Sequence, residues 1–367
     1  MPGKITIDRL EGIIQSENIS DLSIDRIRQF FIQEQDIAAY APDGVCQIDP
    51  RNGDRIVYNS ARARRPHDNR PVAANDIPDP DERPCLICQG NTTHVLDIAP
   101  LSEGFTFINK NLYPIFYPNA QDSDVRDLPA NLQERNGKNV SGFHFLQWTS
   151  SYHEKDWHNM PPGDRLIVMK RLAALEKKML QNKGAYVSII KNFGHLVGGS
   201  LAHGHQQIAI SDIIPNRLLQ DKNFCDLQGE SFPSFMLREN PDCLQIRDYG
   251  PAVLLTPYFM RRPYDMVLFL KDTKKSYLHS LSEEELLAVA DGWRDAIRIM
   301  ISVMPKIGKE VAYNITTHNN TGCGLYFEFL PYTQEMGGFE HLGLYLCQGN
   351  PQECAQTCRE LLDEYKL

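Results

Sequence analysis

The sequence GGSLAHGHQQ at residues 198–207 is the most informative stretch of the chain. In an extended segment alternate side chains point to the same side, so His203, His205 and Gln207 are predicted to line one face of a strand. Three polar side chains on one buried face need partners, which a metal, a phosphate or a substrate can provide. Because an isolated His-x-His pair is common in proteins without such a role, the flanking residues decide its meaning.

Small residues and a cation flank this segment. Residues 198–200 carry little side chain, so their backbone N–H groups can approach an anion. Lys191 and Asn192 stand at the end of an apolar, strand-like run at 186–190. A cation, an amide, a small-residue turn and the His-x-His-x-Gln segment together indicate a phosphate site with a nucleophile.

The composition is that of a globular protein, with 42% hydrophobic and 23% charged residues among 367. This length predicts two domains or one large domain. The net charge of −9 argues against nucleic-acid binding, which needs clustered Lys and Arg. No apolar run reaches the roughly 18 residues of a membrane span, and the first residues lack a signal-peptide core. Nine cysteines fit reduced thiols better than a disulfide framework, so we expect a cytoplasmic protein.

A weak internal repeat follows a largely helical start at residues 1–40 and a hairpin at 45–58. The first copy is predicted as a strand, a helix, a strand and the histidine strand, the first three at 143–148, 162–180 and 186–190. The second copy is predicted with the same order at 266–270, 282–300, 311–316 and 325–330. Ser282 and Glu285 are expected to form a capping box at the start of the second helix. One crossover helix per copy predicts two similar α+β modules.

The Cys-x-x-Cys sequence at Cys85 and Cys88 can place two thiolates on one tetrahedral Zn²⁺. A closed site needs two more ligands, and His153 and His203 are the candidates. A redox pair is an alternative, although nothing nearby resembles a thioredoxin-type strand and helix. Two unrelated reduced cysteines are the other alternative.

Other conspicuous residues are given structural roles. Trp148, Trp157, Cys354 and Cys358 are expected in the core, the two cysteines because they lie four apart on the last helix without a histidine partner. His318 is expected to be a loop or surface histidine.

Several short signals occur in a fixed order along the chain. They lie at 49–53, 62–66, 85–88, 111–114, 153, 191–192, 200–207 and 337–340. Because these signals occur in this order and at these separations, the chain resembles the galactose-1-phosphate uridylyltransferase family of the histidine-triad superfamily, including its ADP-glucose phosphorylase-like branch. The resemblance covers the chain from about residue 48 to its end.

The resemblance implies an α+β fold of two histidine-triad-like modules, each an antiparallel half-barrel with a crossover helix. Residues 1–42 would be a helical N-terminal extension. Residues 43–235 would form the catalytic module with the zinc site, and residues 236–367 a second, non-catalytic module. Such proteins are usually homodimers.

The chemistry implied by the resemblance is a two-step nucleotidyl transfer. His205 would attack the α-phosphorus of a nucleoside diphosphate hexose, and the covalent nucleotidyl-histidine would pass its nucleotide to an acceptor in ping-pong fashion. Gln207 would bind a non-bridging phosphate oxygen, and Ser200 and Asn192 would contact the phosphates. The remaining substrate contacts would come from Arg62 and Arg65 (phosphate), Asn111 (base and ribose) and Glu340 (hexose hydroxyls).

The same resemblance gives the metal a structural role. One zinc held by Cys85, Cys88, His153 and His203 would fix the segment that carries His205. No second metal is expected, because the places of the transferases' second site hold Arg217 or Asp221, Tyr326 and Glu328. A glutamine that contacts the sugar in those transferases is replaced by Leu346, which weakens any case for galactose.

The prediction is therefore an enzyme of carbohydrate metabolism, a nucleotidyltransferase that acts on a nucleotide sugar and on phosphate or a sugar 1-phosphate. One alternative is a phosphorylase of ADP-sugars or of diadenosine polyphosphates. Another is a zinc-stabilised nucleotide-binding protein without turnover, which would not need a nucleophile. Neither a nucleic acid nor a membrane is an expected partner, and the base and the sugar cannot be read from the sequence.

Overall fold

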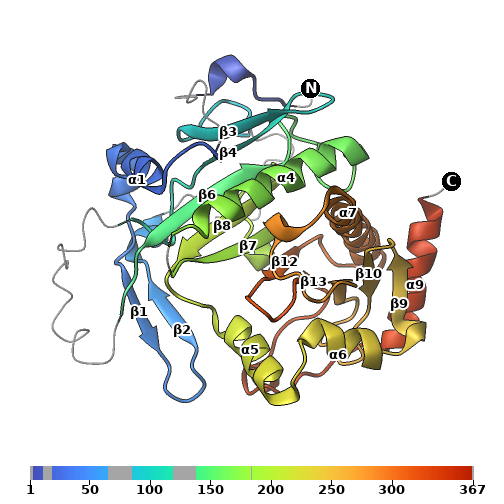
Figure 1. Cartoon of the computed structure of the whole chain (residues 1–367). Coiled ribbons are helices and arrows are strands. Elements are labelled where there is room, and N and C mark those ends of the chain that lie inside the picture. Colours follow the sequence, from blue (N-terminus) through green and yellow to red (C-terminus); the bar gives the residue numbers. More distant parts are fainter. Residues whose placement is uncertain (1–2, 11–18, 65–84, 119–137, 183, 366–367) are drawn as a thin grey trace, which may run out of the picture. The chain divides into compact units, whose positions relative to one another are not determined.

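The computed structural model describes residues 3–10, 19–64, 85–118, 138–182 and 184–365 (Figure 1). Its α-helices are α1 (Ile24–Gln33), α2 (Gln35–Ala39), α4 (Pro162–Met179), α5 (Asn216–Gln228), α6 (Phe232–Glu239), α7 (Glu283–Lys306), α8 (Gly338–His341) and α9 (Pro351–Glu364). Short 3-10 helices are η1 (Ile7–Arg9), η2 (Ser60–Arg64), η4 (His195–Val197), η5 (Asp242–Leu244) and η6 (Leu278–Ser280). Within these described segments, no helix is both long and apolar enough to cross a bilayer.

Two sheets accompany these helices. The smaller has the order β2-β1-β5, with β1 (Val45–Ile48), β2 (Arg55–Tyr58) and β5 (Lys138–Asn139). The larger has the order β3-β4-β6-β8-β7-β12-β13-β11-β10-β9. Its strands are β3 (Val95–Pro100), β4 (Phe105–Lys110), β6 (Gly142–Trp148), β7 (Tyr186–Phe193), β8 (His205–Ser211), β9 (Gln245–Asp248), β10 (Ala252–Leu255), β11 (Met266–Leu270), β12 (Tyr313–His318) and β13 (Tyr326–Pro331). Antiparallel pairing, as between β6 and β8 or β12 and β13, confirms the α+β class.

Contacts within the chain define two compact units. The first comprises Met1–Tyr152, Arg171–Ile189 and His205–Gln220, and the second comprises His153–Lys170, Ile190–Gly204 and Asp221–Leu367. The predicted hairpin, the two predicted helices and the predicted strands of both repeats are present with small shifts at their ends. The module boundaries at 42–43 and 235–236 stay predictions.

The segment around α1 is part of the core of the first unit. Phe31 on α1 is completely buried and packs edge-on against Phe143 and Phe145 of β6, with ring centroids 5.3 Å apart in each pair. The N–H of Ile19 donates to the Asp97 carboxylate at 3.1 Å. The buried ammonium of Lys110 on β4 donates to the carbonyl of Phe30 at 2.7 Å. Helix α1 is therefore fixed to the sheet, and α2 packs against α1.

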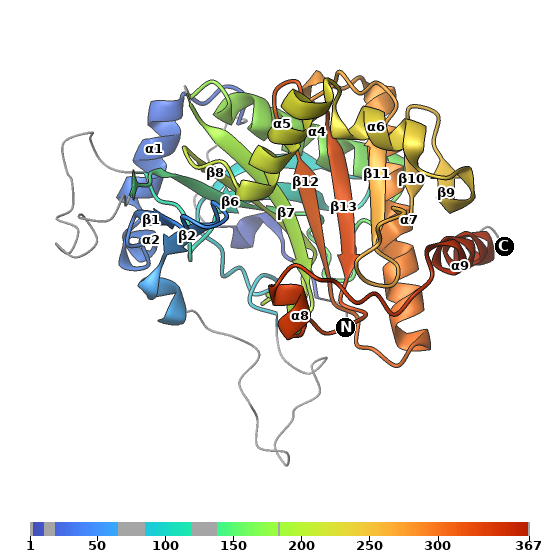
Figure 2. The same cartoon turned by 90° about the horizontal axis from the view of Figure 1, so that it is seen from below.

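The long helix α7 organises the second unit (Figure 2), where it runs beside β10, β11 and β13. Its start has the predicted capping box, because Ser282 Oγ accepts from the N–H of Glu285 and the Glu285 carboxylate accepts from the N–H of Ser282. Its buried Trp293 packs against Trp157, at 5.2 Å between ring centroids. The core positions predicted for Trp148, Trp157, Cys354 and Cys358 are confirmed by their burial.

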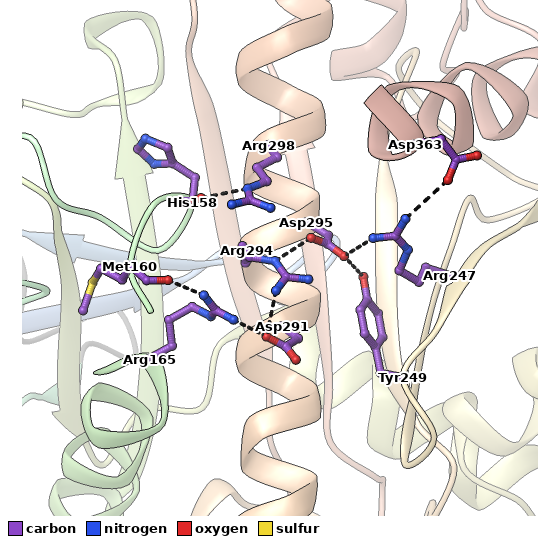
Figure 3. A network of polar contacts seen from close by, with 10 residues as sticks. All are labelled: His158, Met160, Arg165, Arg247, Tyr249, Asp291, Arg294, Asp295, Arg298 and Asp363. Carbon is purple, nitrogen blue, oxygen red and sulfur yellow. Dashed lines mark hydrogen bonds and ion pairs between the residues drawn. The ribbon is translucent and has the colours of Figure 1, made fainter. Parts of the chain in front are cut away.

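A network of arginines and aspartates fixes α7 in the second unit (Figure 3). Asp295 is 0% exposed and accepts hydrogen bonds from Arg294 at 2.7 Å, Arg247 at 2.9 Å and Tyr249 at 3.0 Å. Burial alone would raise the pKa of Asp295, but these two arginines outweigh it and hold the pKa below its usual value. The same network joins Arg165 to Asp291 and to the Met160 carbonyl, and Arg298 to the His158 carbonyl.

The expectation that His318 is a loop or surface residue is wrong. His318 ends β12 and is buried, with Nδ1 2.7 Å from the Asp221 carboxylate and Nε2 3.0 Å from the Glu328 carboxylate. Tyr326 stacks on its ring at 4.1 Å and donates its hydroxyl to Asp221 at 2.8 Å. Burial would lower the pKa of His318, but the two carboxylates outweigh it and raise the pKa to about 9.

This ion triad predicts a pH-dependent stability. Because the folded pKa of His318 lies above its unfolded value of about 6.5, its stabilisation is fully present below that value and is lost as the pH rises through about 9. We expect the free energy of unfolding to fall by about 2 kcal/mol over this interval. Urea unfolding at a series of pH values measures it, and His318→Asn should flatten this part of the profile. An unchanged slope in His318→Asn would contradict the assignment.

Candidate functional site

The histidine segment does not form one continuous strand. Strand β8 begins at His205, whereas His203 lies in a bend before it and is completely buried. The predicted common strand face for His203, His205 and Gln207 is therefore wrong for the first of them. The chain passes closely over Asp156 here, since a Cβ on Gly204 would lie 2.7 Å from the Asp156 carboxyl carbon. Only glycine fits between the two histidines without a shift of that neighbour.

The four predicted metal ligands are brought together. The donor atoms of Cys85, Cys88, His153 and His203 all lie within 4.8 Å of one another. Ligand atoms about 2.0–2.3 Å from one tetrahedral ion are separated by somewhat less than this, so small movements would complete the site. The set therefore fits one metal ion that prefers sulfur and nitrogen.

The knuckle that carries the cysteines is closed by its own backbone and by the N-terminal segment. The N–H of Gly90, a residue with φ of +90°, donates to the Ile87 carbonyl at 2.9 Å. The guanidinium of Arg9 donates to the Cys88 carbonyl at 3.0 Å. The N–H of Ile5 donates to the Ser151 carbonyl at 2.9 Å, two residues before His153. Residues 5–9 thus hold the chain next to three of the four ligands.

His205 is held firmly at the start of β8. It is 6% exposed and lies opposite Trp148 of β6, with the two rings 4.9 Å apart at 37°. The next side chain, Gln206, donates to the buried Gln147 at 2.6 Å. Because neighbouring strand residues face opposite sides, this bond anchors the other face of β8, while Trp148 packs against the His205 ring.

Polar contacts in the first unit connect the predicted site residues Gln207 and Asn111 through His144, which sequence reasoning missed. Gln207 Oε1 lies 3.1 Å from Nε2 of His144, and the amide nitrogen of Asn111 lies 3.3 Å from the same ring. Asn111 Oδ1 accepts from the N–H of Tyr113 at 2.9 Å, and Arg62 donates to the Tyr113 carbonyl at 3.0 Å. Gln207, Asn111 and Arg62 therefore form one group, whereas Arg65 lies outside the described residues.

The residues predicted to contact phosphate from the second unit surround a tight turn. Asn192 accepts from the amide of Asn314 at 2.8 Å, and Ser200 follows the turn as a half-buried residue. The N–H of Gly198 donates to the His195 carbonyl at 3.2 Å, and the N–H of Gly199 donates to the Gly194 carbonyl at 3.0 Å. The turn therefore uses the N–H groups of Gly198 and Gly199 itself, which corrects the expectation that these two would face an anion, whereas the expectation for the N–H of Ser200 stays a prediction.

Lys191, the cation of the predicted phosphate site, is paired beside Gly204 with a carboxylate that sequence reasoning missed. The completely buried ammonium of Lys191 contacts the Asp156 carboxylate at 2.7 Å. Burial would raise the pKa of Asp156, but the charge of Lys191 outweighs it and lowers the pKa. Lys191 is therefore neutralised by a carboxylate, which argues for a supporting role in holding the segment at Gly204.

Glu340 lies on the short helix α8 in the second unit. Its carboxylate accepts from the N–H of Gly337 at 2.8 Å and from the N–H of Leu346 at 3.3 Å. These backbone hydrogen bonds lower the pKa of Glu340. The carboxylate orders the 337–346 segment, and its predicted contact with a hexose stays a prediction.

Comparison with known proteins gives the class to which this arrangement belongs. No protein-family model matches the chain. The chain has the fold of uridylyltransferases and ADP-glucose phosphorylases, which confirms the predicted fold class and the predicted resemblance to uridylyltransferase-like proteins. By sequence it is 21% identical over 335 residues to an ADP-glucose phosphorylase from Arabidopsis thaliana, covering 85% of this chain and 92% of that protein.

Solved structures agree with this class. A uridylyltransferase superposes with a TM-score of 0.68 at 19% identity, covering 88% of this chain and 99% of that one. An ADP-glucose phosphorylase from Arabidopsis thaliana with bound ADP-glucose gives a TM-score of 0.60 at 18% identity, covering 86% and 97%. The protein that is similar to this chain in sequence and these structural neighbours are thus nucleotidyltransferases or ADP-glucose phosphorylases.

Proposed function

We propose that this chain is a nucleotidyltransferase that moves a nucleoside monophosphate from a nucleoside diphosphate hexose to an acceptor through a covalent intermediate on His205. The observation that carries the proposal is the position of His205, which is nearly buried at the start of β8. It lies two residues after His203, a member of the Cys₂His₂ cluster, and two residues before Gln207, which contacts His144. Such a histidine has the rigidity that in-line attack on phosphorus requires. A binding protein without turnover would not need it.

The proposed reaction has two displacements at one phosphorus. A neutral imidazole nitrogen of His205 attacks the α-phosphorus, and the bond to the sugar 1-phosphate oxygen breaks, so that the electron pair leaves with the sugar 1-phosphate. The nucleotidyl-imidazolium keeps the proton on its other ring nitrogen. An acceptor phosphate oxygen then attacks the same phosphorus and releases the neutral imidazole. Gln207 donates to a non-bridging oxygen, and Ser200 and Asn192 contact the phosphates.

Binding of the rest of the substrate is assigned to four further residues. Arg62 and Arg65 clamp the phosphate of the sugar 1-phosphate or of the acceptor, as planar guanidinium groups do well. Asn111 is assigned to the base and ribose, and Glu340 to the hexose hydroxyls. The group of Arg62, Asn111 and Gln207 supports this assignment for the phosphate and nucleoside end of the substrate.

The acceptor is either inorganic phosphate or a hexose 1-phosphate. The similarity to an ADP-glucose phosphorylase over 85% of the chain favours a phosphorylase that acts on an ADP-sugar. Incubation with UDP- and ADP-glucose labelled in the α-phosphate, without an acceptor, should trap an acid-labile and alkali-stable label on the protein. Discharge by phosphate or by hexose 1-phosphate then identifies the acceptor, and absence of any label would overturn the proposal. A thermal-shift panel of UDP-, ADP- and GDP-sugars selects the base, since a ligand of the folded state raises its stability.

We propose further that the metal of the Cys₂His₂ cluster is one structural zinc. Two thiolates and two imidazoles are a donor set typical of closed zinc sites, and all four residues are at most partly exposed. When bound, the zinc would tie the Cys85 knuckle to His203, and only Gly204 separates His203 from the nucleophile. The metal would therefore stabilise the position of His205 without touching the substrate.

Replacement of a zinc ligand tests this role. Cys85→Ser is expected to weaken metal affinity by at least about 10-fold and to lower the melting temperature, because serine is a poor zinc ligand. Mass spectrometry of the purified protein measures the metal, with about one zinc per wild-type chain expected. Cys243→Ser, at an exposed cysteine, is the matched control and should keep both values. Loss of zinc with unchanged stability would contradict a structural role.

We also propose a homodimer in the cytoplasm. The 336–346 segment exposes large apolar side chains, those of Met336, Phe339, Leu342, Leu344 and Tyr345, and a patch of this kind suits a protein interface. None of the nine cysteines, all of which lie in the described segments, is joined in a disulfide, as expected for a reducing compartment. Sedimentation equilibrium tests the dimer, and a monomer at micromolar concentration would contradict it.

A further inference from the structure

A buried histidine on the strand next to the nucleophile contacts the proposed phosphate-binding glutamine. His144 of β6 is 0% exposed, and its Nε2 lies 3.1 Å from Gln207 Oε1 on β8. On the other side of the ring, the N–H of Ile115 donates to Nδ1 at 3.1 Å. Neither contact depends on a residue outside the described segments.

These two contacts determine the tautomer of the imidazole. A backbone N–H can only donate, so Nδ1 of His144 must be the acceptor in the contact with Ile115. The proton of a neutral ring therefore lies on Nε2, which donates to Gln207 Oε1. Both ring nitrogens are thus used, one as an acceptor and one as a donor.

Asn111 does not reverse this assignment. Its Oδ1 accepts from the N–H of Tyr113 at 2.9 Å, so its NH₂ group must face His144. That nitrogen is 3.3 Å from both ring nitrogens, and as a donor it can add only to the lone pair on Nδ1. The backbone of Tyr113 and Ile115 therefore sets the direction of every hydrogen bond in the group.

The tautomer of His144 determines the orientation of the Gln207 amide. An amide can turn by about 180° with little change in shape, and the two orientations offer opposite hydrogen-bonding groups. Because the Nε2–H of His144 requires an acceptor, Gln207 must keep its oxygen toward His144. Its NH₂ group is then left as a donor, and no hydrogen bond to this group occurs among the residues that the structure describes.

We propose that His144 is a positioning residue, which holds the amide of Gln207 so that its NH₂ group, and not its oxygen, faces a phosphate oxygen of the substrate. This inference rests on the proposed nucleotidyl transfer. The amide oxygen would repel the phosphate, whereas the NH₂ group stabilises the charge that develops on it. A preset donor of this kind needs no rearrangement during the reaction.

A double-mutant cycle on His144 and Gln207 tests the proposal. The measured quantity is the rate of nucleotidyl-enzyme formation in a single turnover with ADP- or UDP-glucose labelled in the α-phosphate. We expect Gln207→Ala to lower this rate by about 100-fold and His144→Phe by at least about 10-fold. The double variant should be no slower than Gln207→Ala, because His144 acts through Gln207. His144→Gln should restore most of the rate, since its amide can accept from Ile115 and donate to Gln207.

Two controls separate this role from general damage and from failure of the proposed function. Phe143→Leu alters a buried neighbour on the opposite face of β6, and it should lower stability without lowering the labelling rate beyond 2-fold or so. The proposal is overturned if His144→Phe slows the reaction by the same factor in the wild type and in the Gln207→Ala variant. It is also overturned if His144→Gln gives no rescue. Absence of a label on the wild-type protein would overturn the nucleotidyl transfer itself, which is a distinct result.

Discussion

His205→Asn is expected to abolish nucleotidyl transfer and covalent labelling, with a fall in turnover of at least about 10³-fold. Asparagine is polar and smaller than histidine, so it can occupy the place beside Trp148 without a clash. Its amide nitrogen has no lone pair for attack on phosphorus, and the two-step route through a covalent intermediate is therefore closed. The single-turnover label and steady-state turnover both measure the effect.

The variant should remain folded and loaded with metal. His203 and the other three ligands are unchanged, so zinc content and melting temperature should stay close to those of the wild type. His195→Asn is the matched control, because His195 is an exposed histidine paired with Glu310, and it should keep its activity. If His205→Asn retains wild-type labelling, the nucleophile lies elsewhere and the proposed mechanism is wrong.

Asp295→Ala is expected to produce the largest loss of stability, about 4 kcal/mol. The substitution removes the carboxylate that accepts from Arg294, Arg247 and Tyr249, and it leaves the two guanidinium groups without this counter-charge. A buried network that loses one partner costs more than the pair contributed, because the remaining charges stay desolvated. Urea unfolding monitored by Trp fluorescence gives the difference.

Asp363→Ala provides the comparison within the same network. Its side chain is 65% exposed and lies 3.8 Å from the other terminal nitrogen of Arg247, so its loss should cost less than about 0.5 kcal/mol. The lowered pKa of Asp295 adds a pH signature. Its stabilisation is present above the usual aspartate pKa of about 4 and is lost as the pH falls through the lower folded value. Equal effects of the two variants would contradict the role given to burial.

The metal cluster was predictable from sequence, and the support for Gln207 was not. The Cys-x-x-Cys spacing of Cys85 and Cys88 is typical of a metal site, and His153 and His203 were the predicted partners. His144 carries no local signal within an apolar strand. Its role arises from the register that places Leu146 of β6 opposite Gln207 of β8, 61 positions further along the chain, and from the loop that brings in the Ile115 N–H.

The errors share the same cause. His318 has ordinary neighbours in sequence, and its partner Asp221 is 97 residues away, so burial as part of an ion triad could not be deduced locally. The glycine turn was assigned to an anion because its N–H groups were counted as available. Their acceptors, the carbonyls of Gly194 and His195, become evident only once the backbone path is known.

The packing of α1 against β6 has a consequence for synthesis of the protein. Phe31 and its neighbours leave the ribosome well before their partners, because Asp97 follows Ile19 by 78 residues and Lys110 follows Phe30 by 80 residues. At about 5–20 residues per second, roughly 5–20 s pass before β6 supplies Phe143 and Phe145 to cover Phe31. During this interval the ten residues of α1 have no strand to pack against, and a segment this short does not form a stable helix alone. Cotranslational folding of the first unit therefore cannot begin from its N-terminus, and must wait for the strands that close over it.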